Sequence, residues 1–234
     1  MTTTPPPYGT PEHPRIAVRG EAHHEVDPET ARITITVTTR GKDRRHALED
    51  LTRRNNHVLE LARTYGQSIE KLETGTFSIT PELTKKGRNE QIHAYHGRVH
   101  ITAVLNDFTA LGEFTTTIAD LDMTRINGPW WGLRPDSPAH ATARRQAVHE
   151  AVQRAREYAD ALGSHLTALL ELTDLGAENT TPTTLPTPGA TRGRAAYGAT
   201  APEPPPTLDL EPQRQTVHAQ VNARFLMSPP KLQK

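Results

Sequence analysis

The sequence predicts an α+β fold, a mainly antiparallel sheet with helices packed on one side. Several segments alternate apolar and polar residues with a period of two, which is typical of strands that bury one face and expose the other. Three other segments place apolar residues at helical spacing. Along the chain these elements follow the order β-β-α-β-β-α-β-α-β-β. Such an order favours helices gathered on one side of an antiparallel sheet.

The first half of the chain supplies two strands and a long helix. Apolar residues alternate with polar ones at 16–22 and again at 33–37, with a turn expected at the Asp-Pro pair at 27–28. Asp43 is suited to cap the N-terminus of the following helix, and Gly66 stands where a left-handed residue ends one.

A hairpin and two further helices come next. The hairpin strands are expected around 77–79 and 99–105, and the second helix is capped by one residue of the Asn-Asp pair at 106–107. The third helix opens with a cap at Ser137 followed by proline, and it ends at Gly163. Its stripe of small alanines predicts close approach to a sheet or another helix.

The C-terminal part contains two strands separated by a long loop. Residues 166–172 and 217–225 alternate as strands, and we expect the last strand to lie beside 166–172. About 177–212 the chain is rich in Thr, Pro, Ala and Gly, which predicts a mobile loop inside the domain. Closing a long loop is cheap, since each doubling of its length costs only ~0.6 kcal/mol.

Composition limits the function classes. The chain has 234 residues and no cysteine, which excludes disulfides and thiolate metal sites. Lys+Arg and Asp+Glu number 27 each, so the formal net charge is zero. A nucleic-acid-binding protein gains affinity by releasing counterions from phosphates with its basic residues. Without a basic excess, nucleic acid is not an expected partner.

The termini predict tails and a cytoplasmic location. Residues 1–14 are rich in Pro and Thr and lack the basic and apolar regions of a signal peptide, so a disordered N-terminal tail is expected. No segment approaches the ~18 apolar residues of a transmembrane helix. The folded domain is therefore expected at 15–227, with a C-terminal tail at 228–234.

Several segments occur in a characteristic order: IAVRGEA, DPETARITITV, TGTFSITPEL, IHAYHGRVHITAVL, ARRQAVHEAVQRAREYADALG and VHAQVNARFLM. With the helix that closes at Tyr65-Gly66 and the Pro-rich insertion, they resemble the SIMPL-domain family, whose bacterial members include periplasmic immunogenic proteins. The likeness covers roughly residues 14–227. Family members often have Gly where this chain has Ala94 before Tyr95, and many carry a signal peptide. The resemblance implies an α+β fold, a tendency to form oligomers and no established catalytic residues.

Histidine is enriched, with 12 residues. His96 and His100 share a strand face, whereas His93 points away. Four residues along a strand span ~13 Å, too far for two ligands of one ion. Solvent-facing histidines are therefore favoured over a metal site. His23 and His24 are adjacent, so their side chains point apart, and they too are expected to face solvent.

Three Arg-Arg pairs, at 44–45, 53–54 and 144–145, lie on the solvent side of predicted helices with acidic residues nearby. They are expected to be an ordinary solvated surface. Trp130 and Trp131 lie in a short strand expected at about 124–133, and adjacent strand residues face opposite ways. One indole is expected in the core. The other is exposed or covered by a partner, so the pair is either structural packing or an oligomer or ligand surface.

No G-x-S-x-G, GxGxxG or P-loop motif occurs, so no catalytic, cofactor-binding or metal-binding residue is predicted. The leading hypothesis is a non-enzymatic SIMPL-like protein that forms a homo-oligomer and acts as a scaffold or interaction module. Trp130 or Trp131 would then lie at the interface. The alternative is a small-molecule or metal-binding protein that uses the polar sheet face near Trp130 and the histidines. A hydrolase of unrecognised type is a third possibility.

Overall fold

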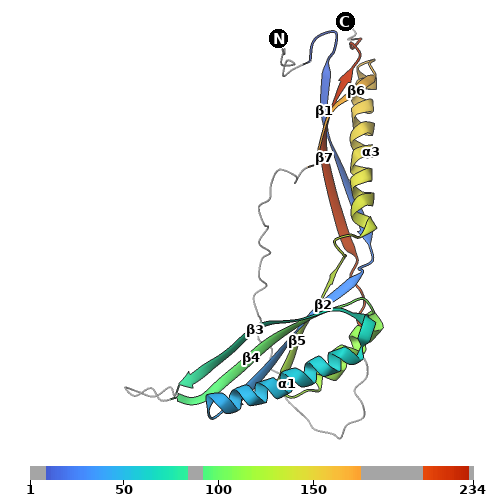
Figure 1. Ribbon diagram of the computed structural model, residues 1–234. Helices are drawn as coiled ribbons and strands as arrows, with labels where there is room; N and C mark the ends of the chain where they lie inside the picture. Colours follow the sequence, from blue (N-terminus) through green and yellow to red (C-terminus); the bar gives the residue numbers. More distant parts are fainter. Residues whose placement is uncertain (1–8, 84–91, 175–207, 232–234) are drawn as a thin grey trace, which may run out of the picture. The chain divides into compact units, whose positions relative to one another are not determined.

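The computed structural model describes residues 9–83, 92–174 and 208–231. The described residues confirm the α+β class and the expected order of elements. Figure 1 shows these helices and strands along the chain. In chain order the elements are β1 (Arg15–Val26), β2 (Thr30–Gly41), α1 (Arg44–Thr64), the 3-10 turn η1 (Gly66–Ser68), β3 (Ile69–Leu83), β4 (Ile92–Leu105), α2 (Phe108–Ala119), β5 (Thr124–Gly132), α3 (Pro138–Ala161), β6 (Leu166–Asp174) and β7 (Gln215–Met227).

The strands form two sheets, in the orders β1-β7-β6 and β3-β4-β2-β5. The described parts of Met1–Val26, Pro135–Tyr197 and Thr216–Lys234 make one compact unit, and those of Asp27–Arg134 and Gly198–Gln215 make a second. The sequence alone predicts a single domain at 15–227. β1 and β2 flank the Asp-Pro pair at 27–28 but belong to different sheets, because β1 pairs with β7 whereas β2 pairs with β4 and β5.

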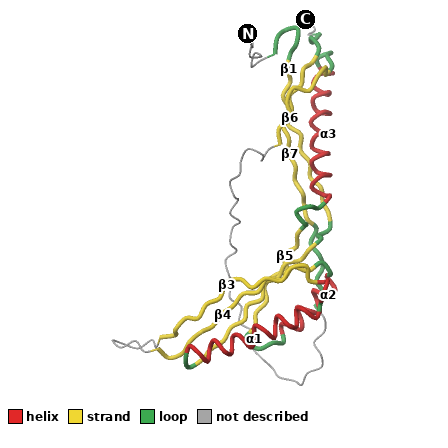
Figure 2. The backbone as a smooth tube through the Cα atoms, in the orientation of Figure 1, coloured by secondary structure: helices red, strands yellow, loops and turns green. Residues whose placement is uncertain are grey.

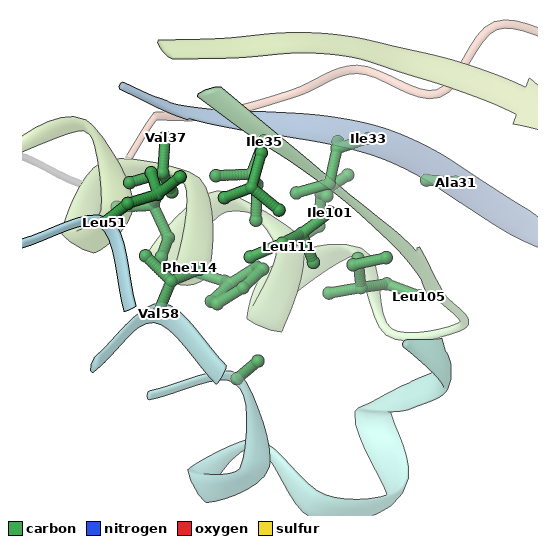
Figure 3. Packing of buried hydrophobic residues seen from close by; sticks show 14 residues of the cluster. Ala31, Ile33, Ile35, Val37, Leu51, Val58, Ile101, Leu105, Leu111 and Phe114 are labelled. Atoms are coloured by element: carbon green, nitrogen blue, oxygen red, sulfur yellow. The ribbon is translucent and has the colours of Figure 1, made fainter. Parts of the chain in front are cut away.

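The four-stranded unit has its core between the sheet and the helices α1 and α2. Figure 3 shows Ile35 of β2 lying close to Leu111 and Phe114 of α2, and all three side chains are fully buried. Asp43 caps α1, accepting a hydrogen bond from the His46 amide at 2.8 Å, as the sequence predicts. Gly66 follows the end of α1 with a φ of +52°, the left-handed conformation expected there.

The two faces of this sheet differ as the alternation predicts. Ile33, Ile35 and Val37 of β2 are buried toward the helices. The residues between them lie on the opposite, outer face. Antiparallel pairing places His100 of β4 and Arg125 of β5 directly opposite Thr36, so all three share that outer face.

The three-stranded unit is built around α3, which runs alongside the strands (Figure 2). Ser137 caps α3 and proline follows it, as predicted. The buried row of α3 consists of alanines at every fourth position: Ala139, Ala143, Ala147, Ala151, Ala155 and Ala159. A Cβ added at Gly20 of β1 would lie 2.0 Å from the Ala147 carbonyl oxygen. Helix and strand therefore meet almost backbone to backbone.

β7 is the central strand of this sheet, between β1 and β6. Leu169 lies opposite Phe225, and Leu172 lies opposite Ala223. The expected placement of the last strand beside 166–172 is therefore confirmed.

Most of the loop expected at 177–212 lies outside the described residues, as does most of the N-terminal tail expected at 1–14. The last part of the loop, 208–212, is described and contacts α2. The Leu208 amide donates to Thr116 Oγ1 at 3.2 Å, and Leu210 packs against the core of the four-stranded unit. The backbone of Leu208 and the side chain of Leu210 therefore attach the end of the segment to the four-stranded unit.

Candidate functional site

The outer face of the sheet β3-β4-β2-β5 carries a cavity of about 620 Å³. Three adjacent strands place side chains around it because their outward-facing residues come into register. Thr36 and Thr38 come from β2, His96, Arg98 and His100 from β4, and Arg125 and Asn127 from β5. Met123 and Thr124 complete the lining.

Thr36 forms the floor of this cavity. It is only 8% exposed although it lies on the outer face, because longer side chains stand on both sides of it. Its Oγ1 lies 3.0 Å from His100 Nδ1. Two residues further along β2, the Thr38 hydroxyl donates to the Met123 carbonyl oxygen at 2.9 Å. This bond links the residue just before β5 to β2.

Beside the cavity, the Glu82 carboxylate interacts with both Arg40 and His96. Arg40 Nε donates to Glu82 Oε2 at 2.9 Å, and His96 Nε2 lies 2.9 Å from the same oxygen. The hydrogen bond from Arg40, followed by that from His96, holds the pKa of Glu82 below its ordinary value. His96 is thus engaged by Glu82, while His100 is engaged by Thr36.

The histidines predicted from the sequence do not gather at one point. His96 and His100 line the same cavity, as their shared face predicts, and His93 does not. Within 9–83, 92–174 and 208–231, no three His, Asp or Glu side chains come close enough to hold a metal ion. His23 instead lies against His218 of β7, with 2.6 Å between the two Nδ1 atoms. Sequence reasoning missed this pair because 195 residues separate its members.

The two tryptophans lie on opposite faces of β5. Trp131 packs against the core, with its ring edge-to-face with Phe108 at a centroid distance of 4.8 Å. Trp130 is 45% exposed, and the Arg32 guanidinium lies 5.7 Å from its ring centroid. Strand alternation predicts this division, and the structure identifies Trp130 as the outward ring. It shares the outer face with the cavity, since Arg32 and Trp130 lie directly opposite each other.

The paired arginines behave largely as a solvated surface. Arg45 donates to Glu49 at 3.0 Å on α1, and Arg53 and Arg54 both contact Asp50. On α3, Arg145 donates to the Thr142 hydroxyl at 3.3 Å. The pairs at 44–45 and 53–54 thus have the acidic neighbours that their helical spacing predicts.

The edge strand β6 is an apolar feature that the sequence did not reveal. Leu169, Leu170 and Leu172 are 55%, 44% and 47% exposed. Leu169 and Leu172 face the α3 side, as their register with buried residues of β7 requires, but α3 packs mainly on β1 and leaves them uncovered. A cavity of about 430 Å³ lies there, lined by residues of α3, β6 and β7. Alternation in β6 predicts a strand, but it cannot say which strand the helix covers.

Known proteins resemble this chain along most of its length. A model of the SIMPL family, described as a protein of unknown function (DUF541), matches residues 16–225. The 26 kDa periplasmic immunogenic protein of Brucella melitensis biotype 1 is 25% identical over 173 residues, which cover 71% of this chain and 68% of that protein. The protein of the same name from Brucella abortus strain S19 matches to the same extent. Since the family model spans well over half of the sequence, the chain belongs to the SIMPL family.

Proposed function

We propose that this protein is a non-enzymatic interaction module that self-associates, with the outer edge of β6 as its main contact. The observation that carries the proposal is the row of exposed leucines on a strand whose outer edge pairs with no other strand in the described part of the chain. Such an edge offers unpaired backbone N–H and C=O groups to another chain.

The sequence of β6 supports this use of the edge. Proteins usually protect an exposed edge with lysine, proline or an inward-pointing charge. β6 reads LTALLELTD and has neither lysine nor proline. Its Glu171 is already engaged by Arg224 of β7. A second copy of the chain fits the edge, because a two-fold axis brings the same apolar strip of both copies together. Full burial of one leucine stabilises by about 1.5–3 kcal/mol.

Lysine at two of these leucines tests the contact. Leu169→Lys with Leu172→Lys is expected to convert the wild-type oligomer to monomer, because two desolvated ammonium groups oppose the apolar contact. Light scattering coupled to size exclusion, at tens of micromolar protein, measures the mass. The matched control is Leu48→Lys on α1, which is 42% exposed and should leave the mass unchanged. A wild type that is monomeric at high micromolar concentration would refute self-association.

Trp130 is the second contact we propose, because it is exposed on β5, an edge strand of the other sheet. Truncating an interface tryptophan can cost ~2 kcal/mol or more, roughly a thirtyfold loss of affinity. Trp130→Ala is therefore expected to shift the particle toward smaller mass without lowering the melting temperature. Trp131→Ala should instead destabilise the fold, because Trp131 packs against the core and Phe108. Equal destabilisation by both variants would remove Trp130 from the proposal.

The names of the two relatives also bear on location. Both are called periplasmic, which favours export over the cytoplasmic location expected from the N-terminal residues. The absence of cysteine fits either compartment. No helix in the described ranges is long and apolar enough to span a bilayer. Fractionation of the native host, with an antibody against the protein, decides between the two compartments.

A further inference from the structure

We propose that the cavity on the outer face of β3-β4-β2-β5 binds a small, multiply charged oxyanion of the phosphate or polycarboxylate class. The ligand would lie over Thr36, between Arg98 of β4 and Arg125 of β5. This site is independent of the proposed contact at β6, because the β6 edge belongs to the other compact unit.

The first argument is charge. Arg98 and Arg125 both line the cavity, and no described carboxylate pairs with either of them. The chain as a whole has as many acidic as basic residues, 27 each, and several of its other arginines are paired with carboxylates. Arg40 has Glu82 nearby and Arg45 has Glu49. No carboxylate is among the residues that line the cavity, and the nearby Glu82 is already paired with Arg40, so the charge of the lining favours an anion.

The second argument is placement. Arg98 lies opposite Thr38 on one side of β2, and Arg125 lies opposite Thr36 on the other side. Two strand spacings across the sheet and two residues along it separate their backbones by ~12 Å. Long guanidinium side chains can close on a ligand from both sides of such a gap, and each can present a fork of N–H donors to phosphate or carboxylate oxygens.

The third argument is the floor and the available donors. The Asn127 amide lies on the same face. When Thr36 Oγ1 donates to His100 Nδ1, His100 Nε2 carries the hydrogen and becomes a further donor. Together with the two arginines, these groups surround the buried Thr36 with donors from three strands.

Size then selects the ligand class. A volume of about 620 Å³ lies within the range of ~300–1,000 Å³ typical of small-molecule sites. It exceeds the size of a single phosphate. A compact molecule with two or more anionic groups can present one group to each arginine.

Calorimetric titration of the full chain with inorganic pyrophosphate and, separately, with citrate tests the site in a low-salt, phosphate-free buffer. Heat is expected with at least one probe, and the stronger one identifies the class. Arg98→Gln and Arg125→Gln should each weaken binding about tenfold or more, as expected for the loss of a charged hydrogen bond. Arg63→Gln on the exposed side of α1 makes the same charge change and should keep wild-type affinity.

Three results would overturn the proposal: no heat with either probe, wild-type affinity in both cavity variants, or equal weakening by Arg63→Gln. A thermal melt of each variant checks that these outward-facing substitutions preserve the fold. The Leu169→Lys, Leu172→Lys double variant should bind the anion as wild type does. Its affinity separates a failure of this site from a failure of self-association.

Discussion

Ending the chain after Pro212 is expected to leave the protein insoluble or molten. The truncation removes β7, and β7 is the strand between β1 and β6. Without it neither neighbour has a pairing partner among the described strands. Five of its residues are buried: Val217, Val221, Ala223, Phe225 and Met227. Val221, Ala223 and Phe225 belong to the core cluster that contains alanines of α3.

The magnitude supports a severe effect. Each large side chain of this set stabilises by about 1.5–3 kcal/mol on burial, whereas a folded protein is stable by only ~5–15 kcal/mol. Solubility and the far-ultraviolet circular dichroism melt measure the outcome. A chain that ends after Lys231 is the control, because it retains the hydrogen bond that the Lys231 backbone N–H donates to the Leu162 carbonyl oxygen. A soluble, cooperatively melting truncation at Pro212 would contradict the central position of β7.

Gly20→Ala is expected to cost about 1–3 kcal/mol or more, although it adds a single methyl group. The new Cβ would lie 2.0 Å from the Ala147 carbonyl oxygen and 2.6 Å from the Ala151 amide nitrogen. Both are backbone atoms, so no side chain can rotate away. α3 must lift from β1, which opens the packing along the row.

Urea unfolding monitored by circular dichroism measures this loss. Gly75→Ala is the matched control, since a Cβ there would meet only the His100 carbonyl oxygen at 3.7 Å, an ordinary contact. The midpoint of the Gly75 variant should remain close to wild type. If Gly20→Ala unfolds at the wild-type midpoint as well, α3 does not approach β1 as closely as described.

Local features of the fold could be predicted because their causes lie within a few residues. Asp43 and Ser137 cap helices through hydrogen bonds to amides within three residues, and the period of two in β2 follows from strand geometry. The opposite orientations of Trp130 and Trp131 follow from the same alternation. Which of the two points outward depends on the face of the sheet that α2 covers. The sequence alone does not identify that face, so only the structure shows that Trp130 is the exposed ring.

The remaining features depend on pairing between distant segments. His23 and His218 are 195 residues apart, and no local pattern links β1 to β7. The division of the strands into two sheets follows from such pairings. The cavity could not be predicted from the sequence for the same reason. Its lining depends on how both β4 and β5 are aligned with β2. Sequence reasoning placed histidines and Trp130 near a polar sheet face, but it did not single out Arg98 or Arg125.

The alanine row limits where insertions and deletions can occur in this chain. An α-helix turns by about 100° per residue, so a single inserted or deleted residue in the middle of α3 rotates every later side chain by that angle. All alanines beyond that point would leave β1, and larger, charged side chains would take their places, such as Arg154 after an insertion or Arg156 after a deletion. We therefore expect related chains to differ in length at loops and at helix ends, and to keep the residue count between Ala139 and Ala159 fixed.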